Sequence, residues 1–340
     1  MKPQTVLAFA RGGRLLALRA VTVVMTAYTR ADFVVSAARE GVLAALGQRP
    51  RSVSELAREL RLPAGAEAEL EAWLEVGAAL GELRCAGREW SLAGRLARAL
   101  ARPANDDALA MLEELTTLHR DLVHRALPLL RSGERLSLAD QSGEVVARSS
   151  RMLEPLVQEA VSADVPERGP LRVLEVGCGS GTYVRYMLER NREARVHALE
   201  LQPAVLAQAR QNLEAWGVAD RVTLGEGDVR AFQSSDRFDL VTLHNNIYYF
   251  AVPERVALLR HVRGLLAPGG RVLLTTPCRG GSASGAVLSL WGALTAGCGP
   301  LPRPEELVAQ LTEAGFADAR AESLAGPLER YCAFRGRAAG

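Results

Sequence analysis

The two halves of the chain have different patterns of hydrophobic and polar positions. In the N-terminal half, apolar residues recur at helical spacing, for example over residues 31–46 and 107–131. From Leu171 onward, short runs of consecutive apolar residues, typical of buried parallel strands, alternate with amphipathic segments. We therefore predict helices first, followed by an α/β part built as a doubly wound parallel sheet.

The N-terminal half predicts three helices and a hairpin. Helices are expected over residues 31–46, from Ser52 onward and over residues 66–80, and the second begins with a capping box between Ser52 and Glu55. Residues 83–91 predict a hairpin that turns at Ala86-Gly87. This order is typical of a winged-helix unit, and such units often bind DNA. Residues 66–80 contain four glutamates and no Lys or Arg, so phosphates would repel this helix and a scaffold or dimerisation role is expected.

Two more amphipathic helices are expected over residues 107–131 and 144–162, beyond a break at residues 102–108. The first contains His119, Asp121 and His124, which suggest a metal site. The two histidines are five residues apart, which is not one helical face, and no third ligand is near in the sequence. We therefore expect no metal.

Residues 15–28 form an apolar run that superficially resembles a signal peptide. Arg19 interrupts the run, no small-residue cleavage site follows, and the run is shorter than the roughly 20 residues that span a bilayer. The run therefore predicts a helix that packs on its own domain or on a twin subunit.

The amino-acid composition gives evidence on the cellular compartment of the protein and on its binding partners. The 340 residues have room for two domains, and 41 Lys+Arg against 39 Asp+Glu leave a net charge of +2, which suggests neither a nucleic-acid partner nor another polyanion. The five cysteines are scattered without a CxxC pair, which indicates a reducing cytoplasm.

Residues 172–182 read RVLEVGCGSGT and combine a predicted strand, a glycine turn and the start of a helix. Glycine allows positive φ and lets a ligand lie against the backbone at the helix N-terminus. The spacing is G-x-G-x-G rather than the G-x-G-x-x-G of dinucleotide sites, and Glu175 lies two residues before the first glycine. The loop therefore favours S-adenosylmethionine over NAD.

Further polar groups follow the next predicted strands. The second strand ends at Glu200, which could accept both ribose hydroxyls of an adenosyl ligand. The third is followed by Asp228, which can accept from the exocyclic amine of adenine while Val229 lies against the ring. The fourth, residues 238–244, opens into Asn245 and residues 246–250, where polar and aromatic groups would meet a substrate.

A fifth strand, residues 271–276, follows the turn Leu-Ala-Pro-Gly-Gly, and residues 317–323 and 330–334 predict a closing antiparallel pair. In this order the motifs resemble class I S-adenosylmethionine-dependent methyltransferases across residues 170–335. With the winged-helix front, residues 30–335 resemble dimeric small-molecule O-methyltransferases of the caffeate and polyketide-tailoring kind.

The resemblance implies an α/β fold, with a doubly wound Rossmann-like methyltransferase sheet and an N-terminal all-α winged-helix dimerisation domain. The expected domains are residues 1–105 for dimerisation, 106–168 for linking helices and 169–340 for S-adenosylmethionine binding and catalysis. The residues that it implies for cofactor binding are Glu175, Gly177, Cys178, Gly179, Gly181, Glu200, Leu201, Asp228, Val229, His244 and Asn245.

The predicted catalytic residues, His244, Tyr248 and Tyr249, include one departure from that family. Its fourth strand usually exits as Leu-His-Asp-Trp, in which the histidine is the general base. Alignment places Tyr248 at the base, Tyr249 at the aspartate and Phe250 at the tryptophan, while His244 falls four residues earlier. Three hypotheses remain: His244 acts as a shifted base, Tyr248 orients an already nucleophilic group, or proximity and alignment suffice.

Residues 278–302 are glycine-rich and nearly uncharged, which predicts a lid loop over an apolar or aromatic substrate. We expect a cytoplasmic, homodimeric methyltransferase that acts on the oxygen of a small hydrophobic metabolite and needs neither nucleic acid nor membrane. An N- or C-methyltransferase without the histidine base is the alternative. A winged-helix regulator and an NAD(P)-dependent enzyme are the rivals from other classes.

Overall fold

The computed structural model describes residues 14–140, 142–326 and 330–339. The chain forms two compact units, one of residues up to Arg120 plus Glu144–Ser149, the other of Asp121–Gly143 and Ser150 onward. These limits differ from the expected boundaries at residues 105 and 168. Of residues 106–168, which were expected to link the domains, residues 106–120 and 144–149 belong to the N-terminal unit and the rest to the C-terminal unit. In the C-terminal unit, Leu122 packs with Trp291 and Val157 packs in one core with Val173 of the sheet.

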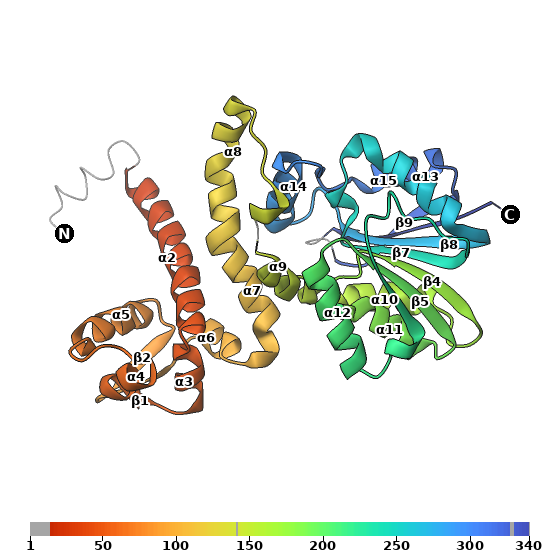
Figure 1. The fold of residues 1–340 in the computed structure, drawn as a ribbon. Helices are drawn as coiled ribbons and strands as arrows, with labels where there is room; N and C mark the ends of the chain where they lie inside the picture. Colours follow the sequence, from red (N-terminus) through yellow and green to blue (C-terminus); the bar gives the residue numbers. More distant parts are fainter. Residues whose placement is uncertain (1–13, 141, 327–329, 340) are drawn as a thin grey trace. The chain divides into compact units, whose positions relative to one another are not determined.

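The N-terminal unit is helical, as predicted, and also contains a small sheet (Figure 1). Its helices up to residue 100 are α2 (Arg14–Arg39), α3 (Val42–Gln48), α4 (Val53–Glu59), α5 (Glu67–Ala79) and α6 (Arg95–Leu100). Strands β1 (Arg51–Ser52), β2 (Leu83–Ala86) and β3 (Glu89–Leu92) pair antiparallel in the order β1-β3-β2. The predicted hairpin is confirmed, whereas β1 had no sequence signal because it has only two residues.

Local signals at the helix ends explain where these helices begin and stop. The capping box at α4 is confirmed, since Ser52 Oγ accepts from the Glu55 amide and Glu55 Oε2 accepts from the Ser52 amide at 2.8 Å. The single helix expected over residues 31–46 is wrong. Gly41, at φ 81°, separates α2 from α3, a left-handed conformation that glycine adopts without steric cost.

The first half of α2 exposes a row of large apolar side chains. They are Leu16, Leu18, Val21, Val23, Val24, Met25 and Tyr28, and the exposed fraction of Leu16 is 78%. Within the described part of the chain, no helix is both long enough and apolar enough to cross a membrane.

Helices α7 (Asp106–Glu114) and α8 (Arg120–Ser132) form the helix expected over residues 107–131, with a π-helical segment at Leu115–His119 between them. The helix expected over residues 144–162 is interrupted. It consists of α9 (Gly143–Ser149) and α10 (Glu154–Asp164), separated by a 3₁₀ turn at Ser150–Leu153.

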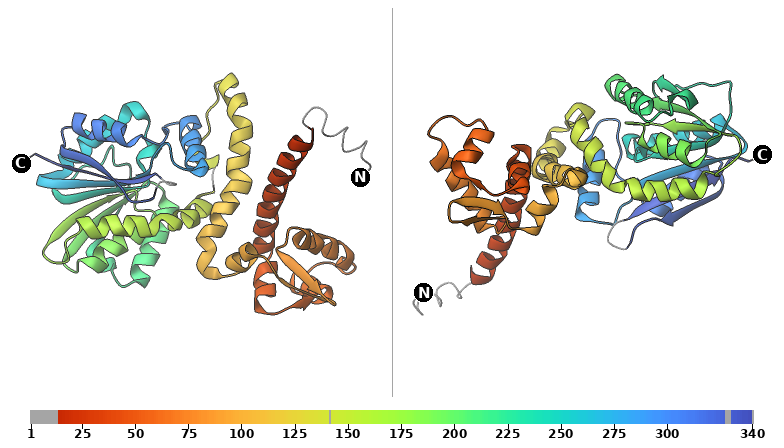
Figure 2. Two further views of the ribbon diagram at one scale, coloured as in Figure 1. Left: turned by 180° about the vertical axis from the view of Figure 1, so that it is seen from behind. Right: turned by 90° about the horizontal axis from the view of Figure 1, so that it is seen from below.

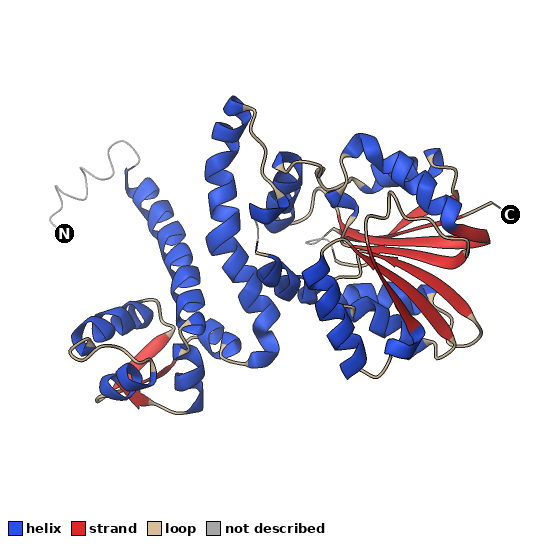
Figure 3. Ribbon diagram, in the orientation of Figure 1, coloured by secondary structure: helices blue, strands red, loops and turns tan. Residues whose placement is uncertain are grey.

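The C-terminal unit confirms the doubly wound sheet, and its described strands form a seven-stranded sheet in the order β6-β5-β4-β7-β8-β10-β9 (Figure 3). The strands are β4 (Leu171–Val176), β5 (Ala194–Glu200), β6 (Val222–Glu226), β7 (Phe238–His244), β8 (Leu266–Pro277), β9 (Ala317–Ser323) and β10 (Tyr331–Arg337). Strands β4 to β8 pair in parallel, while β10 runs antiparallel to both β8 and β9.

Helices cover both faces of this sheet (Figures 1 and 2). On one face, α10, α11 (Thr182–Arg190) and α12 (Pro203–Ala215) share a core with Val173, Val196 and Ala333. On the other, α13 (Arg255–Leu265) and α15 (Pro304–Glu313) share a core with Leu174 and Phe334. Side chains of β4, β5, β7, β8 and β10 alternate between these two cores, so the central part of the sheet is covered on both faces, whereas the edge strands β6 and β9 are more exposed.

The loop expected over residues 278–302 is in part a helix, α14 (Ala283–Leu294). Ser282 Oγ accepts from the Gly285 amide at 3.2 Å and caps this helix. The expectation that this whole segment is a loop is therefore wrong, because its glycines lie mostly outside a run of good helix formers; its role as a lid stays a prediction.

Candidate functional site

The glycine loop joins β4 to α11 and places three left-handed glycines in succession. The φ angles are 66° at Gly177, 54° at Gly179 and 84° at Gly181. A Cβ at Gly179 would meet no atom within 4 Å, whereas one at Gly181 would lie 3.3 Å from Leu213 Cγ. The loop therefore leaves bare backbone at Gly179, while Gly181 allows close packing against α12.

Glu200 connects the end of β5 to this loop. Its carboxylate accepts from the Gly179 amide and from the Gln202 amide, each at 3.0 Å, and the residue is 8% exposed. A carboxylate has about four acceptor directions, so two remain for a ligand beside the open side of Gly179. The predicted end of the second strand at Glu200 is confirmed, while the contact of Glu200 with a ribose stays a prediction.

Asp228, just after β6, is held by a residue that the sequence analysis missed. Arg230 Nε lies 2.9 Å and Nη2 2.6 Å from Asp228 Oδ2, and Nη1 lies 3.0 Å from Glu254 Oε2. The Arg230 guanidinium lowers the pKa of Asp228, so this carboxyl stays ionised. Arg230 fixes the orientation of the Asp228 carboxylate. An amine of a ligand would donate a hydrogen bond to the lone pairs of this carboxylate that Arg230 leaves free.

A buried polar network lies beneath the loop, at the carboxyl ends of β4, β7 and β8. Glu175 Oε2 accepts from Thr242 Oγ1, and His244 Nδ1 lies 2.8 Å from Thr275 Oγ1. His244 Nε2 lies 3.9 Å from Glu175 Oε2, and both side chains are fully buried. Burial raises the pKa of Glu175 to about 8 and lowers the pKa of His244 to about 3, so both groups are predominantly neutral at pH 7.

Asn245 is the point where β7 leaves the sheet, at a φ of 54° that only a minority of non-glycine residues adopt. Its Oδ1 accepts from the Tyr331 hydroxyl at 2.8 Å, and its Nδ2 donates to the Tyr183 hydroxyl at 3.2 Å. The Tyr331 hydroxyl is also 3.0 Å from Thr275 Oγ1. Two tyrosines from β10 and α11 therefore hold the strained backbone of Asn245.

The aromatic residues after Asn245 form part of a separate apolar cluster. The ring centroids of Tyr248 and Tyr249 are 4.9 Å apart, and those of Tyr249 and Trp291 are 5.6 Å apart at 73°. Helices α8 and α14 contribute to this cluster Leu122, Ala126, Leu129, Trp291 and Leu294. The aromatic side chains are edge-to-face or tilted neighbours, so α14 packs against the residues that follow the exit of β7.

Three further residues predicted to bind the cofactor, Cys178, Leu201 and Val229, differ in their exposure to solvent. Cys178 is buried, and burial raises the pKa of its thiol, while its amide donates to Leu199 O at 2.8 Å. Leu201 is 54% exposed after β5, whereas Val229 is 3% exposed in the core. The predicted loop and strand-end residues are thus at one edge of the sheet, as expected from parallel topology.

Several residues that shape this site lacked a recognisable sequence signal. Tyr183, Thr275, Tyr331 and Trp291 come from separate elements and meet the β7 exit only through the fold. Arg230 could have been found, because a cation two residues after an acid in a turn can fold back on it.

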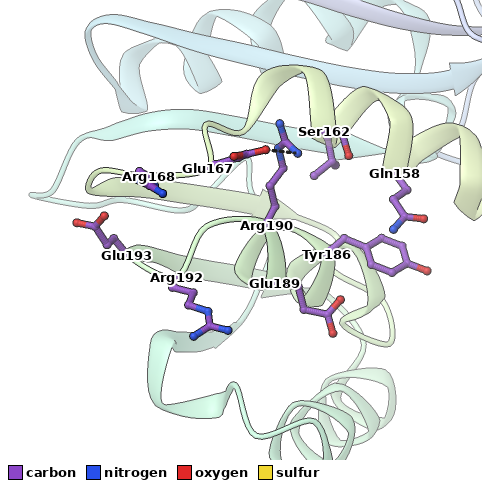
Figure 4. A pocket seen from close by; sticks show the side chains of 10 residues that line it. Gln158, Ser162, Glu167, Arg168, Tyr186, Glu189, Arg190, Arg192 and Glu193 are labelled. Carbon is purple, nitrogen blue, oxygen red and sulfur yellow. Dashed lines mark ion pairs between the residues drawn. The ribbon is translucent and has the colours of Figure 1, made fainter.

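A cavity of about 660 Å³ lies elsewhere in this unit (Figure 4). It is lined in part by Glu167, Arg168, Arg190, Arg192 and Glu193, residues that precede β4 and β5. Ligands of open α/β sheets bind at the carboxyl ends of strands, so this mixed-charge cavity is at the unfavourable edge. Arg190 already pairs with Glu167 at 3.6 Å. Within the described residues, no three His, Cys, Asp or Glu side chains gather as a metal ion would need.

Comparison with known proteins agrees with this geometry. Residues 173–270 match the family model described as "Methyltransferase domain". The ubiquinone biosynthesis O-methyltransferase of Xanthomonas axonopodis pv. citri (strain 306) is 35% identical over 125 residues, 36% of this chain and 50% of that protein. Trans-aconitate 2-methyltransferase of Methylobacterium nodulans is 31% identical over 34% of this chain and 42% of that protein. The matched segment is thus half or less of the length of these two relatives.

Solved structures match over almost the whole chain. The mitomycin 7-O-methyltransferase MmcR has a TM-score of 0.77 at 22% identity, covering 96% of this chain and 99% of that one. An O-methyltransferase family protein from Burkholderia thailandensis has a TM-score of 0.75 at 23% identity, covering 95% and 98%. At these identities the likeness establishes the fold, in both the helical and the α/β parts. Residues 173–270 of the C-terminal unit therefore resemble a methyltransferase domain, and the chain has the fold of these O-methyltransferase structures.

Proposed function

We propose that this protein is an S-adenosylmethionine-dependent methyltransferase that methylates an oxygen of a small, hydrophobic or aromatic metabolite. The observation that carries the proposal is the bare backbone at Gly179, bonded through its amide to the Glu200 carboxylate, within the segment that matches the methyltransferase domain. Open space over one glycine next to a buried acid fits a ribose-bearing ligand.

The residues at this edge fit S-adenosylmethionine. Gly177, Gly179 and Gly181 would lie along its methionine part, Glu200 would accept from its ribose hydroxyls, and Asp228 would accept from its adenine amine. Glu175 is neutral at pH 7 because burial raises its pKa to about 8, so it supports the loop from below more readily than it pairs with an ammonium group. When bound, the cofactor would supply a methyl group on a positively charged sulfur, which would keep the electron pair of the broken carbon–sulfur bond, while the proton of the acceptor hydroxyl would leave to solvent.

The apolar cluster of Tyr248, Tyr249 and Trp291 supports an apolar or aromatic acceptor. His244 is a weak candidate for the base, since its side chain is fully buried and its pKa is lowered to about 3. We propose that His244 positions Thr275 and that Tyr248 and Tyr249 align the acceptor, so that alignment supplies most of the rate. The same burial favours, as a second candidate, methylation of a nitrogen or carbon that needs no histidine base.

We also propose a homodimer. The seven exposed apolar side chains of α2 support it, because so many large apolar side chains exposed around one helix are typical of a segment that another chain covers. All five cysteines are free thiols, which supports a reducing, cytoplasmic location.

The function is tested in two steps. Titration calorimetry of the full chain should detect binding of S-adenosylhomocysteine and none of NADPH, and the opposite result would reject the proposal. Mass spectrometry of candidate phenols, carboxylic acids and amines, incubated with a methyl-labelled donor, then identifies the acceptor atom. Transfer only to nitrogen or carbon would replace O-methylation by the second candidate.

A further inference from the structure

Four arginines gather on one face of the sheet at the edge opposite the glycine loop. They are Arg271 of β8, Arg335 and Arg337 of β10, and Arg320 of β9, and they line a cavity of about 490 Å³. Arg337 pairs with Arg271 and Arg335 pairs with Arg320 in the antiparallel register. Residues directly opposite one another in an antiparallel pair have side chains on the same face of the sheet. Each of these two pairs therefore places two positive charges side by side.

The protein neutralises only part of this cluster. Asp164 at the end of α10 lies 2.6 Å from Arg335 Nε and 3.9 Å from Arg271 Nη1, and Glu322 accepts from Arg335 at 2.5 Å. Arg335 and Asp164 are both buried, with exposed fractions of 7% and 6%, so the base of the cavity is a fixed ion pair. Asp318 is the other acid that lines the cavity.

Arg320 and Arg337 remain without a carboxylate partner among the described residues. The nearest bond of Arg320 is a long one, 3.5 Å, to the carbonyl of Asp318, and both side chains are exposed at the mouth of the cavity. Cross-strand pairs of like charge are unfavourable unless an anion lies between them, and the planar guanidinium matches phosphate oxygens in a two-pronged contact.

We propose that this arginine cavity is a binding site for a phosphoryl group, with Arg320 and Arg337 as its ligands and the Arg335–Asp164 pair as its base. The site is independent of methyl transfer, because its residues come from the amino end of β8 and from the antiparallel strands at the side of the sheet. The ligand is either free inorganic phosphate or the phosphate ester of a metabolite.

The test is calorimetry and thermal unfolding of the full chain in a phosphate-free buffer, with sodium chloride added to equal ionic strength. Inorganic phosphate should bind and raise the unfolding midpoint, and the double variant R320Q/R337Q should weaken binding about tenfold or more. The matched control R195Q/R210Q removes two exposed arginines outside the cavity and should bind phosphate like the parent.

Glucose 6-phosphate separates the two sources. If glucose 6-phosphate binds more tightly than inorganic phosphate, the ligand is a phosphorylated metabolite; if inorganic phosphate binds more tightly, the ligand is the free anion. Either result supports the site if the two affinities no longer differ in R320Q/R337Q. Retained binding of S-adenosylhomocysteine by the double variant shows that it is folded. Equal phosphate binding by parent and double variant, or no effect of phosphate beyond that of chloride, overturns the proposal.

Discussion

The Tyr331 hydroxyl of β10 lies 2.8 Å from Asn245 Oδ1, at the residue where β7 leaves the sheet. This bond connects an antiparallel strand near the C-terminus to the strand exit in the middle of the unit, 86 residues away in sequence. Because Asn245 has a φ of 54°, its backbone depends on such contacts for its conformation. The position of the β7 exit relative to the glycine loop is therefore set partly by β10.

Tyr331→Phe tests this relationship. Removing the hydroxyl leaves the half-buried Asn245 side chain and the buried Thr275 hydroxyl without one partner, so the free energy of unfolding should fall by about 1–3 kcal/mol. The affinity for S-adenosylhomocysteine should also fall. Tyr186→Phe is the matched control, since its hydroxyl bonds Glu154 at a half-buried position. Equal effects of the two variants on ligand affinity would contradict a positioning role for Tyr331.

Gly179→Ala separates backbone strain from contact with a ligand. A Cβ at Gly179 would meet no protein atom within 4 Å, and the same holds at Gly217 after α12, where φ is 69°. Both alanine variants should lose about 1 kcal/mol of stability from the left-handed backbone. Only Gly179→Ala should lose affinity for S-adenosylhomocysteine in calorimetry. If Gly217→Ala loses as much affinity, the loss does not come from the loop.

Glu200→Gln tests the acid at the end of β5. The variant keeps the shape of the side chain but weakens the acceptor that holds the Gly179 amide, so S-adenosylhomocysteine should bind about tenfold or more weakly. Glu226→Gln is the control, because Glu226 is the directly paired residue on β6. Unchanged affinity in Glu200→Gln would remove the ribose assignment.

The stability of the protein should depend on pH through two buried groups. Glu175, with its pKa raised from 4.5 to about 8, is protonated in the folded state and ionised in the unfolded state between these values, so stability falls as pH rises through that range. His244, with its pKa lowered from 6.5 to about 3, has the opposite slope between pH 3 and 6.5.

The two slopes oppose each other between pH 4.5 and 6.5, and Glu175 acts alone from pH 6.5 to about 8. Between pH 6.5 and about 8, the contribution of Glu175 to the free energy of unfolding should fall by about 1.4 kcal/mol per pH unit. Glu175→Gln has no ionisable group at this position, so its denaturant-unfolding free energy should be flatter than that of the parent in this range. A parallel slope in parent and variant would show that Glu175 is ionised in the folded protein.

Val24→Glu tests the dimer. Val24 is 67% exposed on α2, so the charge should leave the fold of the unit intact while it opposes burial of this helix in an interface. Light scattering should give a dimeric mass for the parent and a monomeric mass for the variant. Arg14→Glu changes the charge at an exposed, already polar position of the same helix and should leave the mass unchanged.

The sequence by itself determined the strands of the C-terminal sheet and the glycine loop. The apolar residues Val173, Leu174 and Val176 predict a strand that is buried on both faces, and the glycines that follow allow the positive φ angles of the turn into α11. Because β4, β5 and β6 pair in parallel, their carboxyl ends lie at one edge of the sheet. This edge carries Glu175, Glu200 and the start of the turn at residues 228–230. The capping box between Ser52 and Glu55 was also predicted correctly, because it depends only on residues within one helical turn.

Only the tertiary structure decided which side chains meet around Asn245 and how each ionises. Tyr331 and Tyr183 reach it from elements far apart in the chain, and no spacing rule relates them. The burial of His244, and with it the lowered pKa of its imidazole, depends on what packs against the end of β7. Local pattern describes what a residue prefers, whereas burial and neighbours determine the charge and the hydrogen-bond partners that it finally has.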